Sequence, residues 1–194
     1  MFKHKFWLTI FFVFNFFAVL AIATGMLGSK FAIILAVLQC AAIALFAWFD
    51  LEQGIYAALL AVPFYLAIPN SRFDALSAWR FAFLELFAVF AYKKMRAKEK
   101  IRFFSWDRNL KYFAAIIIFT ILFIEPASSV GLKKFLFGLN IYLFYIVALN
   151  VVESKEQIKR ALKVTLISLF TFVILGFVQL FASFSSNIYY NKSK

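Results

Sequence analysis

The residues whose types and spacing could do chemistry gather in one stretch, residues 70–87, which reads NSRFDALSAWRFAFLELF. The charged side chains within it are Arg72, Asp74, Arg80 and Glu85. Charges between long apolar runs are costly, so each must be anchored at an interface, paired, or part of a site. Arginine forks match phosphate oxygens in geometry. Arg72 and Arg80 are therefore candidates for binding a phosphate or pyrophosphate, with interfacial anchoring as the alternative.

Glu85 is the deepest of these charges. Ser71 and Asp74 have the spacing of a capping box, so we expect a helix from about Arg72 to Tyr92. Glu85 then lies about 20 Å along that helix, too deep for its short side chain to reach the interface. We predict that Glu85 faces other helices, as a packing residue or as part of an intramembrane site, and needs a partner or a proton. The polar candidates in other apolar runs are Asn15, Gln39, Asn140, Asn150 and Gln179.

The elements that must position these charges are predicted to be membrane-spanning helices. The chain is 65% hydrophobic and 15% charged, with a mean hydropathy of +0.89, far more apolar than a soluble domain. Period-2 alternation is absent, which favours helices over barrel strands. About seven runs approach the roughly 20 residues that a bilayer crossing needs. The predicted spans are 7–27, 31–49, 54–69, 73–92, 109–125, 134–152 and 161–183, in a single region over 1–194.

The third of these spans is short and carries Pro63, which predicts a kink. The fold class predicted from these observations is thus all-α, a polytopic bundle of about seven transmembrane helices.

Lys and Arg are distributed unevenly between the two ends of these spans. Fourteen of the 21 fall on one side, near the N-terminus, in 93–111 and in 155–163. The positive-inside rule makes that side cytoplasmic, so the N-terminus is cytoplasmic and the C-terminus and residues 70–77 are extracytoplasmic. The basic 93–111 segment is interleaved with aromatic residues. We interpret it as a topology determinant beside anionic membrane lipids and not as a nucleic-acid-binding segment.

Motifs for cofactor and metal chemistry are absent from the sequence. It contains no glycine-rich phosphate loop, no CxxC pair and no HExxH. The single cysteine, Cys40, lies in an apolar run, and the single histidine, His4, lies near the N-terminus. We therefore expect no cofactor and no metal site, and no nucleophile, base and orienting group can be assembled from these residues alone.

Three stretches carry a resemblance to a known family. They are IPNSRFDALSAWRFAFLELFAVFAYKKMR, KKFLFGLNIYLFYIVALNVVESKEQIKRALK and LISLFTFVILGFVQLF. The second contains the pattern V-x-S-x-E-x-(L/I)-(K/R)-R at residues 152–160. In order and spacing these stretches, over about residues 51–183, resemble the N-terminal portion of the O-antigen ligase and O-antigen polymerase superfamily, bacterial multi-span enzymes that handle lipid-linked glycans.

The resemblance implies an inverting, metal-independent glycosyltransferase at the outer face of the bacterial inner membrane, in lipopolysaccharide or other cell-surface polysaccharide biosynthesis. The donor would be a glycan on undecaprenyl pyrophosphate, and the acceptor a lipid, a protein or another glycan. In that family the catalytic loop lies downstream of the matched region. Catalytic residues are thus expected beyond residue 194, or on a partner chain. Arg72 and Arg80 lie where the family has its outer turn, but they match no motif to which a role can be assigned.

Two other function classes stay open. A small structural or assembly subunit of an envelope complex would be complete at this length and would co-purify with a stoichiometric membrane partner. A proton-coupled carrier would use Glu85 and would lose transport when Glu85 is replaced by glutamine.

Overall fold

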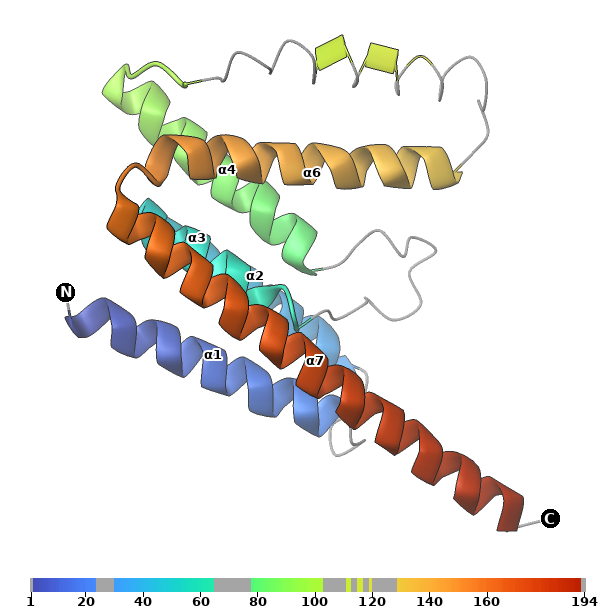
Figure 1. The fold of residues 1–194 in the computed structure, drawn as a ribbon. Helices are drawn as coiled ribbons and strands as arrows, with labels where there is room; N and C mark the ends of the chain where they lie inside the picture. The colour runs from blue at the N-terminus through green and yellow to red at the C-terminus, as the bar shows by residue number, and fades with distance from the viewer. Residues whose placement is uncertain are drawn as a thin grey trace.

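The computed structural model describes residues 2–23, 30–64, 78–102, 111–112, 115–116, 119 and 129–192. The regular elements within these residues are helices and none is a strand, which confirms the predicted all-α class. Figure 1 shows the helices, which are α1 (Phe2–Ala23), α2 (Lys30–Phe49), α3 (Leu51–Ala61), α4 (Ala78–Ala97), α6 (Ser129–Val151) and α7 (Lys155–Lys192).

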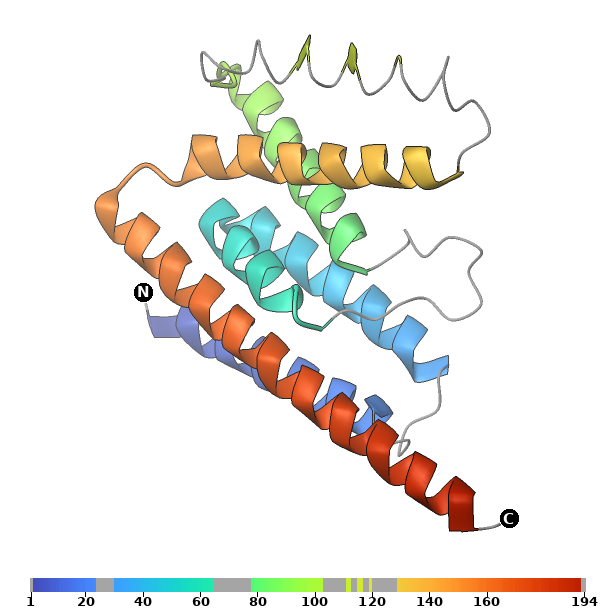
Figure 2. The same ribbon diagram turned by 45° about the vertical axis from the view of Figure 1, so that its right-hand side comes forward.

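The helices pack around α2, α3 and α4. Helix α4 packs against both α2 and α3, and α6 lies against the far side of α4. Helix α1 packs against α2 and α3, and α7 runs along α3. In Figures 1 and 2, α1 and α6 accordingly lie at opposite sides of the bundle. The buried core joins Ile43 of α2, Ile55 of α3, Leu86 and Phe90 of α4, and Val147 of α6.

A single residue, Asp50, links α2 to α3. Its backbone is extended (φ −149°, ψ 117°), and its side chain caps α3 by accepting a hydrogen bond from the Glu52 amide at 2.9 Å. The two helices then pack very closely. A Cβ atom placed on Gly54 would lie 2.6 Å from the Cβ of Ala47 and 2.7 Å from its Cα. Only glycine therefore allows this approach of α3 to α2.

Helix α3 ends at Ala61, before the end of the span expected at 54–69. Pro63 has no amide hydrogen, so the carbonyl of Leu59 loses its regular helical donor. The amide of Val62 reaches that carbonyl only at 3.4 Å, whereas the Ser168 hydroxyl of α7 donates to it at 2.7 Å. Instead of the expected kink, the structure shows a helix end that α7 stabilises. Residues 65–70 lie outside the described part of the chain.

Other helix bounds also differ from the expected spans. Helix α2 closely matches 31–49, whereas α7 begins at Lys155 and is continuous over 38 residues, longer than the expected 161–183. Helix α4 continues to Ala97, five residues past Tyr92. The capping box expected at 71–74 and most of the span 109–125 fall outside the described residues.

Large apolar side chains cover much of the exterior. One helical segment among the described residues, Lys155–Val178, is long and apolar enough to cross a membrane, against the seven predicted. Shorter apolar helical stretches are Phe6–Ala21, Ile33–Phe49 and Gly138–Val151. Only 17% of the apolar window in Lys155–Val178 is buried. Its exposed large side chains include Leu162, Leu166, Ile167, Leu169, Phe170, Phe172, Val173 and Phe177.

Candidate functional site

One end of the bundle gathers polar side chains from several helices. We call it the polar end: the turn at Asp50, the end of α4 with the segment that follows it (residues 93–102), and the turn at 152–154 between α6 and α7. The Lys93 ammonium donates to the Ala47 carbonyl at 2.9 Å, which joins the end of α4 to the end of α2. The Arg102 guanidinium lies 2.8 Å from the Glu153 carboxylate. In Figure 1 these segments lie at the left-hand side, with the N-terminus.

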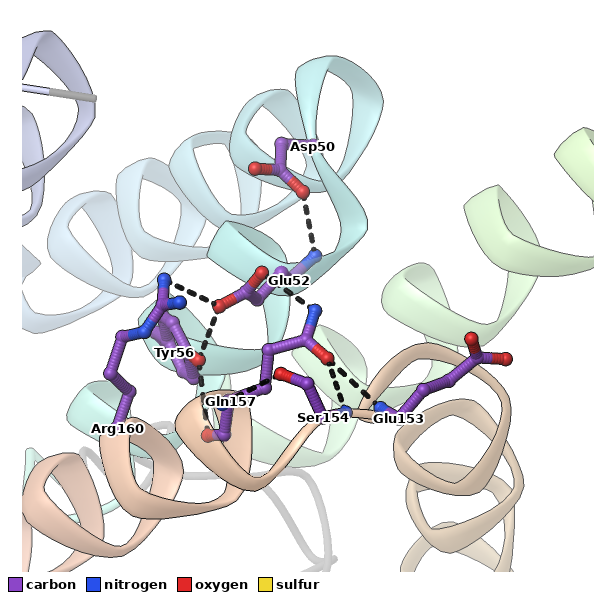
Figure 3. Close-up of polar contacts among 7 residues, drawn as sticks. All are labelled: Asp50, Glu52, Tyr56, Glu153, Ser154, Gln157 and Arg160. Atoms are coloured by element: carbon purple, nitrogen blue, oxygen red, sulfur yellow. Dashed lines mark hydrogen bonds and ion pairs between the residues drawn. The ribbon is translucent and has the colours of Figure 1, made fainter.

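Glu52 is the centre of the most connected group at this end (Figure 3). Its side chain is 15% exposed. Its Oε1 accepts from the Tyr56 hydroxyl at 2.5 Å and lies 3.2 Å from Nη1 of Arg160. Its Oε2 accepts from the Gln157 side-chain amide at 2.9 Å. We call Glu52, Tyr56, Gln157 and Arg160 the Glu52 cluster; it joins the start of α3 to the start of α7.

The start of α7 is built by a capping box of the Ser-x-x-Gln type. The Ser154 hydroxyl accepts from the Gln157 amide at 3.1 Å. In return, Oε1 of Gln157 accepts from the backbone amides of Ser154 at 2.9 Å and Glu153 at 3.0 Å. These bonds satisfy amides that the first turn of a helix leaves without partners. They also hold the Gln157 side chain so that its Nε2 points at Glu52, as Figure 3 shows.

Chemically, the Glu52 cluster is a closed unit. The carboxylate of Glu52 and the guanidinium of Arg160 neutralise each other, and both carboxylate oxygens already accept hydrogen bonds. The Tyr56 hydroxyl, which has one proton, also lies 3.3 Å from the Gln157 carbonyl oxygen. A carboxylate engaged in this way is a poor general base, because its lone pairs are already used. The cluster therefore suits the joining of helices more than proton transfer to a substrate.

A second junction at the polar end ties α6 to the segment that follows α4. The Asn150 side chain accepts from the Arg102 amide at 2.8 Å and donates to the Arg102 carbonyl at 3.0 Å. It also donates to the Ile146 carbonyl of its own helix at 2.9 Å. One buried side chain thus pairs with both backbone groups of Arg102, which holds that segment against the end of α6.

Of the residues predicted as a site, the structure describes only Glu85 with its side chain. Glu85 lies at the edge of the buried face of α4, with Ala82 and Leu86 buried and Phe81 exposed. Its Oε2 is buried and has no hydrogen-bond partner among the described residues. Arg80 lies in the first turn of α4, but its side chain is outside the described part, as is the whole of Arg72. The phosphate-binding role of the two arginines stays a prediction.

Three of the five polar residues considered as partners for Glu85, namely Asn15, Gln39 and Asn150, have other partners. Gln39 donates to the Asn15 side chain at 2.6 Å, and Asn15 donates to the Phe11 carbonyl at 2.6 Å, so the two join α1 to α2. Asn150 pairs with Arg102, as described above. Asn140 is buried, and its Oδ1 has no partner within the described residues. The Gln179 side chain lies outside the described part.

The Glu52 cluster was missed by reasoning from sequence. The pattern at residues 152–160 contains Ser154 and Gln157 at capping-box spacing, which predicts the start of a helix. Nothing in that pattern names Glu52, which is 105 residues away from Gln157 in the chain. Only the packing of α3 against α7 brings the two together.

Within the described residues, no group of three or more His, Cys, Asp or Glu side chains is placed to hold a metal ion. Comparisons of the chain with protein-family models, with curated proteins and with solved structures each found no match. The resemblance to the O-antigen ligase and polymerase superfamily therefore rests on the quoted stretches alone and stays a prediction.

Proposed function

We propose that the chain is a polytopic helical bundle of the bacterial inner membrane. The observation that carries this proposal is the apolar exterior of α7, where large side chains such as Leu166 and Phe170 are exposed. A core helix of a soluble protein with this hydropathy would bury those side chains, whereas lipid accepts them at no cost. Exposed apolar side chains on α1 and α2, among them Phe17 and Val37, extend the same surface.

The charges of the polar end indicate how the bundle is oriented in the membrane. The edge-to-face contact of Phe11 with Phe46, at 5.9 Å between ring centroids, places the first half of α1 beside the end of α2. The basic segments 93–102 and 155–163 begin at the same end of the bundle. Since these segments hold most of the positive charge described, we assign the polar end to the cytoplasmic face.

The orientation has a direct test by cysteine labelling. In a Cys40→Ala background, single cysteines replace Lys100 at the polar end and Asn70, which lies in the segment that the positive-inside rule predicts to be extracytoplasmic. We expect a membrane-impermeant maleimide to label Asn70→Cys in intact cells, and Lys100→Cys only after permeabilisation. Labelling of Lys100→Cys in intact cells would show that the polar end faces outward, and would contradict the proposed orientation.

Within the membrane, we propose that the bundle belongs to a glycosyl-transfer protein acting on undecaprenyl pyrophosphate-linked glycan at the outer face. Support comes from the stretch at 152–160 that carries the family resemblance. In this chain it forms the capped turn between α6 and α7, and two of its residues, Gln157 and Arg160, bind Glu52. The motif thus joins α3 to α7 in this bundle, and we assign the transfer chemistry to the family's downstream loop.

The glycan role is tested in source cells that lack the chain. We expect carrier-linked glycan to accumulate and the surface glycan to disappear, with restoration by the native sequence. Arg72→Gln and Arg80→Gln should fail to restore it, whereas Lys100→Gln, a matched loss of charge at the polar end, should succeed. An unchanged surface glycan, together with co-purification of a stoichiometric membrane partner, would instead favour an assembly subunit.

A proton-coupled carrier is the second candidate, because one buried oxygen of Glu85 has no hydrogen-bond partner within the described residues. An acid with a buried oxygen that lacks a hydrogen bond, inside a membrane bundle, is suited to taking up and releasing a proton. In proteoliposomes, Glu85→Gln would then abolish proton-driven uptake without loss of the folded protein. Uptake that survives this change would eliminate the carrier.

A further inference from the structure

An open pocket of about 350 Å³ lies at the polar end, between α2 and α4. It is lined by Trp48 of α2 and by Tyr92, Lys93, Arg96 and Ala97 of α4. The rings of Trp48 and Tyr92 are stacked, with centroids 5.6 Å apart and planes 19° from parallel. The pocket therefore combines an aromatic wall with two cationic side chains.

Among the described residues, no acid forms an ion pair with either cationic side chain of this pocket. Arg96 is exposed and makes no ion pair with any side chain in the described part of the chain. Lys93 uses one of its three ammonium protons on the Ala47 carbonyl. The acid that follows in sequence, Glu99, is held by Lys94 at 2.6 Å. Asp50, at the end of α2, accepts from the amide of Glu52.

Two large apolar side chains that neighbour lining residues of the pocket in the sequence are exposed. Phe49 and Met95, the sequence neighbours of Trp48 and Arg96, are each 77% exposed. Trp and Tyr side chains prefer the headgroup level of a membrane, where one part of the ring is apolar and the other is wet. Arginine binds phosphate oxygens through two parallel hydrogen bonds. A pocket lined by two cationic and two aromatic side chains fits a phosphate that is attached to a lipid.

We propose that this pocket binds the phosphate group of an anionic phospholipid, with Arg96 as the main contact and Lys93 as a second positive charge. The stacked Trp48 and Tyr92 border the headgroup. The inference rests on the membrane placement proposed above. It concerns the polar end of the bundle and uses neither Arg72 nor Arg80, and so it is independent of the glycan role.

The test is native mass spectrometry of the full chain in detergent, titrated with phosphatidylglycerol or with phosphatidylcholine. The key variant is Arg96→Gln, and Lys100→Gln is its control because it removes the same charge from an exposed residue outside the pocket. We expect preferential retention of phosphatidylglycerol by the native chain. Arg96→Gln should weaken this binding about tenfold, as expected for loss of a charge-assisted pair. Lys100→Gln should change it by less than about twofold.

Equal losses in both variants would mean diffuse attraction to the basic segment and would overturn the proposal, as would no loss in Arg96→Gln. Inorganic phosphate that displaces the lipid at similar concentration would assign the pocket to free phosphate and overturn the lipid assignment. Circular dichroism of each variant shows whether the helices are retained. Detergent phase separation tests the membrane placement separately, because partition into the aqueous phase would defeat that placement whatever the two variants do.

Discussion

Two glutamates in this molecule are held in opposite ways. Glu52, at the polar end, receives hydrogen bonds on both carboxylate oxygens, from Tyr56 of its own helix and from Gln157 and Arg160 of α7. Glu85, along α4, has a buried oxygen without a hydrogen-bond partner among the described residues. A carboxylate bonded on both oxygens stabilises the packing of the helices that it joins. A carboxylate with a buried oxygen that lacks a hydrogen bond costs stability, so its presence needs an explanation other than stability. The difference separates a structural acid from a candidate functional one.

Among the variants that test this comparison, we expect Glu52→Ala to lower the free energy of unfolding the most. Glu52→Ala removes three hydrogen bonds and leaves the charge of Arg160 without its partner. We expect the free energy of unfolding in detergent to fall by about 3 kcal/mol. Arg160→Ala in the Glu52→Ala background should cost little more, since the pair is already lost. A loss below about 1 kcal/mol for Glu52→Ala would show that the cluster does not join α3 to α7.

A smaller effect is expected at Gly54, which positions Glu52 by allowing α3 to approach α2. Gly54→Ala puts a methyl group 2.6 Å from the Cβ of Ala47, so the helices must separate. We expect a loss of about 2 kcal/mol by the same unfolding measurement. Ala47→Gly should restore only part of it, because the Cα of Ala47 would still lie 2.7 Å from the new atom. Unchanged stability in Gly54→Ala would contradict the close approach.

Replacing Glu85 should change the free energy of unfolding much less than replacing Glu52. Glu85→Gln keeps the shape of the side chain and removes the charge of an oxygen that has no partner in the described residues. We expect the free energy of unfolding to change by less than about 1 kcal/mol, in either direction. A loss as large as that of Glu52→Ala would mean that Glu85 is also a helix-joining residue.

The smallest effect concerns an exposed ion pair, Lys94 with Glu99. The hydrogen bond from Lys94, at 2.6 Å, lowers the pKa of the Glu99 carboxyl below the ordinary value for glutamate. A lowered folded-state pKa stabilises the fold above the unfolded pKa, and this contribution is lost as the pH falls through the folded pKa. In Lys94→Met we expect the pKa of Glu99 to rise toward its ordinary value in a carbon-detected NMR titration. An unchanged pKa would show that the pair is not formed in solution.

The start of α7, within the pattern at 152–160, shows how much of the fold the local sequence predicts. The span was expected only from residue 161, whereas the structure begins α7 at Lys155, where Ser154 and Gln157 have the spacing of a capping box. Pro63 likewise marks an interruption in its apolar run, because it has no amide hydrogen. That the interruption is a helix end, with Ser168 bonded to the Leu59 carbonyl, depends on where α7 lies.

The sequence by itself determined the all-α class and the approximate positions of most helices, because a helix satisfies its backbone hydrogen bonds within its own segment. Only the tertiary structure decided which polar side chains meet. Glu52 binds Gln157 and Arg160, more than 100 residues away, and Asn150 binds the Arg102 backbone and not Glu85. Such partners follow from how apolar helix faces pack. Many arrangements satisfy the same hydrophobic pattern, so the local sequence does not select among them.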